Sequence, residues 1–404
     1  MDDPKNIADP TSTCHDTDAF RIRVVNSFND IDKSKWSRLR FTHSAEGQPY
    51  NPFVSYEYLA ALEFAECATA QTGWLGQHLL LESAAGDLLG ALPCYIKSHS
   101  RGEYVFDHGW ADAFERAGGN YYPKLQASIP FTPATGPRLL CADEGRDSAV
   151  RSALAQGLRT LTDRLSLSSA HVTFIPDGET EHFAESGYLM RTDQQFHFRN
   201  DSYDSYSDFL ATLASRKRKA LKRERRVALE NDITIDWLTG TDLTESVWDS
   251  FYAFYMDTGS RKWGRPYLNR AFFSRVSESM AQDVLLIMAR RGSRYVAGAI
   301  NFIGSDTLFG RHWGCIEDHP FLHFEVCYHQ AIDFAIERGL RTVEAGAQGE
   351  HKLSRGYMPV TTRSAHYITH AGLRNAVADY LDHERDDVER IGRLLRRHGP
   401  FRKT

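Results

Sequence analysis

The stretch HFEVCYHQAIDFAIERGLRTVEAGAQGEHKLSRGY, residues 323–357, decides the fold of this chain. Its first part repeats apolar residues three and four positions apart, the pattern of a helix with one buried face: Phe324, Cys327, Tyr328, Ala331, Ile332 and Ala335. Gly339 stands where a glycine commonly ends a helix, and an apolar strand begins at Arg341. This order of helix, glycine, strand and polar loop predicts an α/β sheet, in which ligands gather at the carboxyl ends of strands.

The loop that follows this strand is the candidate active site. It carries acids, bases and anion-binding groups close together: Glu344, Gln348, Glu350, His351, Lys352, Arg355 and Tyr357. Gly346 and Gly349 allow a ligand to approach the backbone closely. Residues of these types in one glycine-bracketed loop indicate binding and chemistry rather than a simple connection.

The composition indicates a globular protein of two or three domains. The chain has 404 residues, with 42% hydrophobic and 25% charged residues, both ordinary for globular proteins. Its net charge of −5 gives no overall field for nucleic acid, so any such site must be a local patch. The six cysteines form no CxxC pair, and the histidines show no metal-ligand spacing, so we expect neither disulfides nor a metal.

The sequence also indicates where the protein works. Residues 1–19 lack the basic and apolar regions of a secretory signal, and no run reaches the roughly 18 apolar residues of a membrane span. We therefore expect a cytoplasmic protein without stable membrane insertion. No feature of the sequence points to an oligomeric state.

Helices and strands follow one another in a similar order in two halves, which suggests a structural duplication. Among them we expect strands at 78–82 and 233–238 and a helix at 207–232. We expect a mixed α+β fold with a disordered tail at 1–19, a first domain at 20–200, a second at 201–372 and a C-terminal helix within 373–404 that packs back on the domains. Residues 100–137 are too polar and aromatic for a core element, and 187–206 have the composition of a crossover between halves.

A basic run at residues 215–226 is the second feature of interest. It contains eight cations and one acid, with Arg216, Lys217, Arg218 and Lys219 in succession. Such a helix binds a polyanion such as tRNA through phosphate contacts. The alternative is a solvated face, or a cluster paired with acids of the C-terminal helix.

Several short segments carry a resemblance to a known family. They are residues 102–107, 121–126 and 130–133 in the first half, and 223–226, 261–264, 310–314, 322–325 and 344–352 in the second. In these segments the chain resembles tandem GNAT-fold proteins of the Fem-like family, labelled peptidoglycan biosynthesis/recognition proteins. The resemblance implies two GNAT-like domains, each a central mixed sheet flanked by helices. It also implies transfer of an aminoacyl group from aminoacyl-tRNA to an amine.

The attack of an amine on an ester or thioester requires a base and fixed donors for the oxyanion, which suggests roles for individual residues. Glu344 or Glu350 would be the base for the amine, Lys352 and Arg355 would bind anionic groups, and Tyr357 or His323 would donate a proton. The expected substrate-binding residues are Arg311, Trp313, Glu325, Tyr328, Gln348, His351 and Arg355, with Tyr121, Tyr122 and Lys124 in the first half. No bound cofactor is required.

One segment departs from acetyl-CoA-using GNAT proteins. Those enzymes hold the diphosphate in a glycine-rich turn before the long helix, whereas residues 313–320 here offer one glycine and two acids. We therefore expect aminoacyl-tRNA as the co-substrate. The alternatives are an acyl-CoA-dependent N-acetyltransferase and a non-catalytic protein that binds a cell-wall precursor. The acceptor is a small-molecule or precursor amine.

Overall fold

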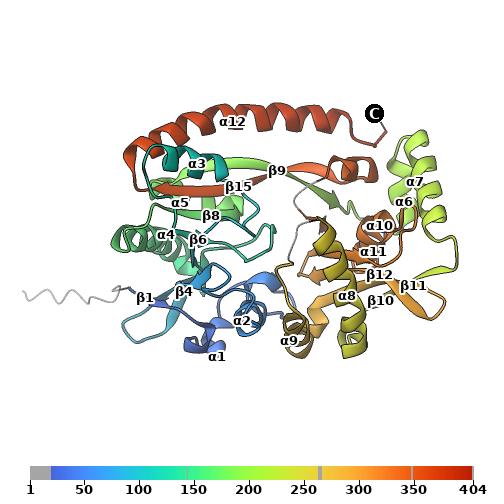
Figure 1. Ribbon diagram of the computed structural model, residues 1–404, viewed down its shortest axis with the longest axis horizontal. Coiled ribbons are helices and arrows are strands. Elements are labelled where there is room, and N and C mark those ends of the chain that lie inside the picture. The colour runs from blue at the N-terminus through green and yellow to red at the C-terminus, as the bar shows by residue number, and fades with distance from the viewer. Residues whose placement is uncertain (1–19, 143, 263–265, 347–348, 403–404) are drawn as a thin grey trace, which may run out of the picture.

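The computed structural model describes residues 20–142, 144–262, 266–346 and 349–402 (Figure 1). The tail expected at residues 1–19 lies outside these ranges. The strands are β1 (Arg21–Val25), β2 (Trp74–Gly76), β3 (His78–Glu82), β4 (Leu88–Leu92), β5 (Tyr95–Lys97), β6 (Lys124–Ala127), β7 (Leu140–Cys141), β8 (Ser169–Ile175), β9 (Leu189–Arg199), β10 (Ile233–Leu238), β11 (Val284–Arg291), β12 (Arg294–Ile303), β13 (Thr307–Cys315), β14 (Thr342–Glu344) and β15 (Met358–Ile368).

Helices cover both faces of these strands. They are α1 (Lys33–Trp36), α2 (Tyr56–Phe64), α3 (His108–Arg116), α4 (Asp147–Arg164), α5 (Thr180–Glu185), α6 (Tyr206–Thr212), α7 (Ser215–Ala228), α8 (Glu245–Lys262), α9 (Arg270–Met280), α10 (Leu322–Phe324), α11 (Gln330–Glu337) and α12 (Ala371–Arg397). A π-helical turn, η7 (Glu325–His329), joins α10 to α11, and the 3-10 helix η8 (Glu350–Arg355) follows β14. The mixed α/β fold predicted from the sequence is confirmed.

One large sheet runs through both halves of the chain. Eleven strands pair in the order β10-β11-β12-β13-β14-β9-β15-β8-β6-β5-β2, and a second sheet has the order β1-β3-β4-β7. At the centre, β9 and β15 pair antiparallel from Met358 opposite His197 to His366 opposite Leu189. Each of these two strands also pairs with a strand from the other half, β9 with β14 and β15 with β8. The pair β9–β15 is called the seam below.

The pairing is symmetric about the seam, which supports the expected duplication. Going outward, β9 meets β14 antiparallel and β14 meets β13 parallel, while β15 meets β8 antiparallel and β8 meets β6 parallel. A long helical segment precedes the inner strand on each side, α11 before β14 and α4 before β8. α12 lies across the seam, packed on both β9 and β15 (Figure 1).

An apolar core also joins the halves. Phe53, just before α2, packs its ring 5.2 Å from Phe302 and 5.1 Å from Phe309, on β12 and β13. Tyr58 of α2 contacts Phe272 of α9 with ring centroids 5.7 Å apart. Because these side chains are all buried, the halves share hydrophobic burial as well as a sheet.

Three segments differ from the sequence-based expectation. Residues 187–206 were expected to be a crossover, but most of them form β9, whose polar residues face the other half and α12. Residues 100–137 were expected to stay out of the core, yet β6 is fully buried because Lys124 is paired there with Glu103 and Asp107. The helix expected at 207–232 breaks at Leu213, where Ala214 donates its N–H to the Pro400 carbonyl.

Close packing of α8 on β13 leads to a test of the fold. A Cβ added at Gly314 would lie 2.1 Å from the Phe254 carbonyl oxygen, and a backbone atom cannot move away easily. We expect Gly314→Ala to lower the free energy of unfolding by about 1–3 kcal/mol, measured by urea denaturation. Gly178→Ala, where nothing lies within 4 Å, is the control. Equal stability of the two variants would contradict this packing.

Candidate functional site

The site lies where two parallel strands separate. β13 pairs with β14 only from Thr307 to Phe309. Beyond Phe309, which pairs with Glu344 at the end of β14, the two strands diverge. On β13, His312 and Gly310 pair with consecutive residues of β12. Arg311 between them has no partner in β12 and forms a bulge. A bulge re-aims its side chain, and ligands bind at the carboxyl ends of parallel strands. The opening between β13 and β14 therefore has the geometry of a binding site.

Glu344 is buried at this opening. The Thr135 N–H donates to its Oε2 at 3.4 Å, and Nδ1 of His197 lies 3.9 Å from its Oε1. Burial raises the pKa of Glu344 to about 8, even though the Thr135 hydrogen bond and the nearby Arg311 and Arg138 charges oppose the shift. A carboxyl group with a pKa near neutral is suited to proton transfer.

Lys352 approaches the same region from η8. It is buried, and its Nζ donates to the Gly346 carbonyl at 2.8 Å. Burial lowers the pKa of Lys352 to about 8, and the positive charge of Arg311 acts in the same direction. The ammonium group is therefore charged through most of the neutral range and lost above it.

Arg311 connects this cluster to the first half of the chain. Its Nη2 donates to the Phe131 carbonyl at 2.6 Å, while its buried Nε has no hydrogen-bond partner in the described part of the chain. Burial lowers the pKa of Arg311, but a guanidinium stays charged at neutral pH. We call Glu344, Lys352 and Arg311 the central cluster.

A histidine that sequence reasoning missed faces the central cluster. Gln195 donates its amide N–H to the Pro133 carbonyl at 2.9 Å, so its Oε1 must accept from Nε2 of His197, 3.2 Å away. His197 then carries its proton on Nε2, and the lone pair on Nδ1 faces Glu344. Burial, with the Lys352 and Arg199 charges, lowers the pKa of His197 to about 3 and keeps it neutral. Only the pairing of β9 with β14 brings it here.

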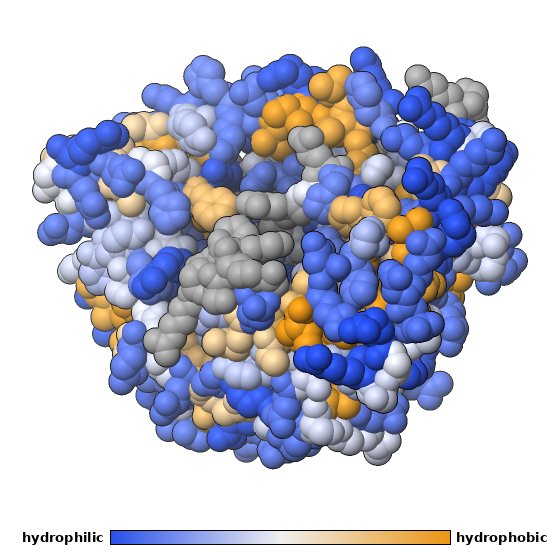
Figure 2. All heavy atoms as spheres, turned by 45° about the vertical axis from the view of Figure 1, so that its right-hand side comes forward, coloured by the Kyte–Doolittle hydropathy of each residue, from blue (hydrophilic) through white to orange (hydrophobic). Residues whose placement is uncertain are grey.

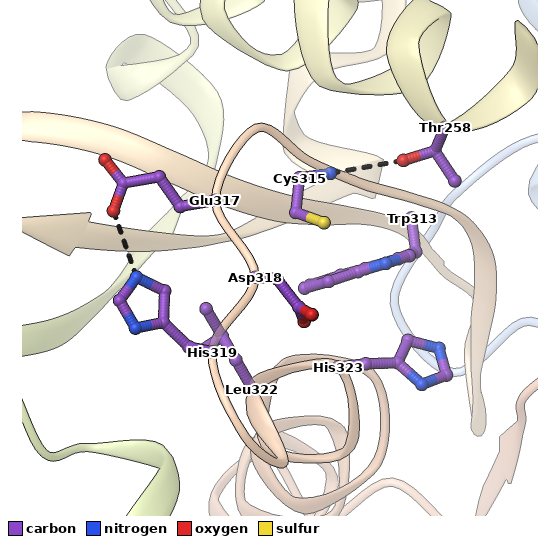
Figure 3. Close-up of a pocket in the computed structure, with 8 residues that line it drawn as sticks. All are labelled: Thr258, Trp313, Cys315, Glu317, Asp318, His319, Leu322 and His323. Carbon is purple, nitrogen blue, oxygen red and sulfur yellow. Dashed lines mark hydrogen bonds and ion pairs between the residues drawn. The ribbon is translucent and has the colours of Figure 1, made fainter. Parts of the chain in front are cut away.

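A hollow lies at the carboxyl end of β13. It has a volume of about 290 Å³ and lies between the end of α8, the end of β13 and the start of α10 (Figure 3). Its walls include Trp313, Cys315, Glu317, Asp318, Leu322 and His323. The rings of Trp313 and His323 meet edge to face at 5.2 Å, and His351, hydrogen-bonded to Tyr328 at 2.9 Å, has its ring 6.3 Å from that of His323. Four predicted site residues thus lie together.

Other predicted residues are engaged inside the protein. Arg355 makes two hydrogen bonds to Glu224, at 2.8 and 2.6 Å, and stacks on Phe324. Glu325 is fully buried and accepts from Arg225. Tyr357 is also fully buried and donates to the Tyr328 carbonyl at 3.2 Å. Gln348 and the side chain of Glu350 lie outside the described residues.

The first-half candidates form a separate cluster. Lys124 is buried and donates to Ser100 at 2.8 Å and to Glu103 at 2.7 Å, as well as to Asp107. Tyr121 donates to Asp107 at 2.7 Å, and Tyr122 is hydrogen-bonded to Ser100 at 2.8 Å. Since β6 lies four strands from β14 in the sheet, this cluster is roughly 19 Å from the central cluster.

The basic helix α7 has two faces. Its inner face places Leu221, Glu224, Arg225 and Ala228 against the protein, whereas six cations are exposed: Arg216, Lys217, Lys219, Lys222, Arg223 and Arg226. No ion pair between described residues joins α7 to α12. Figure 2 turns this side of the molecule forward and shows a largely hydrophilic right-hand edge. The outer face therefore presents positive charge to solvent.

Two searches of the described residues complete the survey. Within those ranges no group of three or more His, Cys, Asp or Glu side chains is placed to hold a metal ion. Among the described helices none is long and apolar enough to cross a membrane.

The symmetric sheet and the opening between β13 and β14 define a protein with two tandem GNAT-like units. The chain belongs to the FemAB-like family, described as peptidoglycan biosynthesis/recognition, which matches residues 27–403. The resemblance to the Fem-like family seen in the sequence is thereby confirmed. Family and fold together support a transferase of acyl or aminoacyl groups in general.

Solved structures agree with this fold. The crystal structure of FemX is similar with a TM-score of 0.53 and 10% identity, over 86% of this chain and 98% of that chain. A conserved protein of unknown function from Bacteroides thetaiotaomicron has a TM-score of 0.53 and 11% identity, over 86% of this chain and 100% of that one. At such identities the likeness shows the fold alone. A search of curated proteins gave no match.

The pairing of Arg355 with Glu224 leads to a second test. Burial alone would raise the pKa of Glu224, but hydrogen bonds from His329 and Arg355 outweigh it and keep that pKa below its ordinary value. Arg355→Met would leave the buried carboxylate with His329 as its remaining partner. We expect the free energy of unfolding at neutral pH to fall by about 3 kcal/mol, measured by urea denaturation.

The pH dependence and a double variant provide the controls. The stabilisation by Glu224 is present above its ordinary pKa of about 4.3 and is lost as the pH falls through the lower folded value. The deficit of Arg355→Met should therefore shrink in acid. Glu224→Gln combined with Arg355→Met should be less destabilised than the sum of the single variants. Additive losses would show that the two side chains act independently.

Proposed function

We propose that the protein forms an amide bond by transferring an aminoacyl group from an aminoacyl-tRNA to an amine on a peptidoglycan precursor. The observation that carries this proposal is the central cluster. A buried carboxyl group and a buried ammonium group, each with a pKa of about 8, lie with a guanidinium at the opening between β13 and β14. This set contains a base and two cations, which is what aminolysis of an ester requires.

The reaction follows from these groups. The acceptor enters as a free amine, and its nitrogen attacks the ester carbonyl carbon, forming a C–N bond and an oxyanion. Lys352 and Arg311 stabilise the oxyanion, and Glu344 takes the proton that the nitrogen loses. When the oxyanion collapses, the C–O bond to the ribose breaks. Glu344 returns its proton to the departing hydroxyl oxygen, so the site ends in its starting state.

The charge of the turn before α10 supports a donor other than acyl-CoA. Where GNAT proteins that use acetyl-CoA cradle a diphosphate, this chain places the exposed carboxylate of Asp318, next to Glu317, which is paired with Arg291. A diphosphate there would be repelled, because like charges at close range are unfavourable. The exposed cations of α7 offer a surface for the phosphates of tRNA instead.

Contacts between the halves support an acceptor bound between them. The first-half loop after β6 reaches the central cluster through Thr135 beside Glu344 and Phe131 beside Arg311. An amine entering the opening would therefore contact both halves. The family description favours a cell-wall precursor as the molecule that carries this amine.

The pKa values of the central cluster lead to a test of the mechanism. Glu344 must be ionised to act as the base, so turnover should rise as the pH increases towards about 8. Lys352 must be charged to stabilise the oxyanion, so turnover should fall above about 8. The assay uses charged tRNA and a stem peptide with a free side-chain amine. We expect Lys352→Arg to lose the falling limb, because a guanidinium stays charged.

Further variants distinguish this mechanism from others. Lys352→Ala should reduce turnover by roughly 10²- to 10³-fold, the usual loss when one oxyanion donor is removed. Glu344→Gln should remove the increase in turnover with pH that depends on ionisation of this carboxyl group. Wild-type turnover in both variants would refute the site. Transfer from acyl-CoA but not from charged tRNA would identify the other donor, and binding without transfer would identify a non-catalytic protein.

The outer face of α7 leads to a test of the tRNA surface. Replacing Arg216, Lys217, Arg218 and Lys219 with alanine should weaken tRNA binding and reduce the slope of log affinity against log salt, since fewer counterions are released. Exposed charges contribute little to stability, so the melting temperature should barely change. Filter binding over a range of salt concentrations measures the slope.

A matched variant controls for net charge. It removes four exposed cations spread over the first half: Arg21, Arg38, Arg116 and Arg164. This variant should keep the wild-type salt slope. Equal loss in the two quadruple variants would show that tRNA responds only to the total charge of the protein.

A further inference from the structure

The hollow at the carboxyl end of β13 has an acidic rim beside an aromatic wall. Figure 3 shows the carboxylate of Asp318 turned toward the space beside the Trp313 indole, with His323 on the opposite side. Leu322 closes the floor and is fully buried. The hollow is thus apolar at its base and acidic at its rim.

The two acids at the rim are not equivalent. Glu317 makes an ion pair with Arg291 at 2.8 Å and a hydrogen bond with His319 at 3.0 Å, so its charge is compensated. Asp318 is exposed and makes no ion pair with any described residue. One carboxylate is therefore available to a ligand, directly beside an indole ring.

This combination favours an organic cation. A carboxylate attracts an ammonium or guanidinium group, and the face of a tryptophan ring attracts the same group through its quadrupole. A phosphate would be repelled at this position. An apolar group would remove water from the carboxylate without providing a hydrogen bond in its place, which is unfavourable.

We propose that this hollow binds the cationic side chain of the transferred residue, so that the enzyme prefers a basic aminoacyl group such as lysyl. The inference rests on the proposed function. Trp313 meets His323 edge to face at 5.2 Å, and the His323 ring lies 6.3 Å from that of His351, the residue before Lys352. The hollow therefore borders the loop that carries Lys352, and the flexible four-carbon stem of a lysyl group carries its ammonium away from the reacting carbonyl towards Trp313 and Asp318.

The test compares two ligands that differ in the terminal ammonium. L-lysinamide and L-norleucinamide have the same backbone and a four-carbon stem, and both are titrated into the whole protein by calorimetry. We expect L-lysinamide to bind about tenfold more tightly, as one carboxylate contact and one cation–π contact at a partly exposed site allow.

Variants locate the preference in the hollow. Asp318→Asn should bring L-lysinamide down to the affinity of L-norleucinamide, while Trp313→Ala should weaken both because the apolar wall is lost. Asp87→Asn, which removes an exposed carboxylate in the turn between β3 and β4, should leave both affinities unchanged.

Each outcome decides a separate point. Equal affinity for the two amides, no binding of either at millimolar concentration, or a preference that survives Asp318→Asn overturns the inference even if transfer occurs. A preference that depends on Asp318 in a protein that transfers nothing from charged tRNA supports the hollow as a cation site and refutes the proposed function instead.

Discussion

The hydrogen-bonded seam between β9 and β15 is the constraint on which the rest of the structure depends. Each strand comes from the end of one half, yet each pairs only with strands of the other half, β9 with β14 and β15, and β15 with β8 and β9. The seam fixes the order of the strands outward in both directions, and α12 covers it. A shared sheet and a shared core therefore hold the two units in one arrangement.

The same seam produces the electrostatics of the central cluster. It brings Gln195 and His197 of β9 beside β14, and the first-half loop places the Thr135 N–H on Glu344. Burial by these groups raises the pKa of Glu344 more than the nearby arginines lower it. Neither half alone has the residues that create this environment. The unusual protonation of the carboxyl group is thus a property of the contact between the halves.

Local patterns predicted local structure well, while contacts distant in sequence were missed. The strands at 78–82 and 233–238 match their predicted limits because apolar residues and flanking turns define them. β9 was missed because its polar residues are satisfied by partners far along the chain. For the same reason Glu344 and Lys352 could be predicted as site residues from the loop, whereas the ion pair between Arg355 and the distant Glu224 could not. Polarity in a sequence does not show whether a group faces a ligand or a buried partner.

The position of β15 between β8 and β9 has a consequence for how the protein is made. On the ribosome, β8 and β9 emerge before the strand that joins them, because all the other strands of the second half are translated between β9 and β15. The nascent first half therefore leaves one edge of β8 and both edges of β9 unpaired while the second half is synthesised, and open edges invite wrong partners. Folding of the amino-terminal half can finish only after the carboxyl-terminal strand is released, so the two halves become native together.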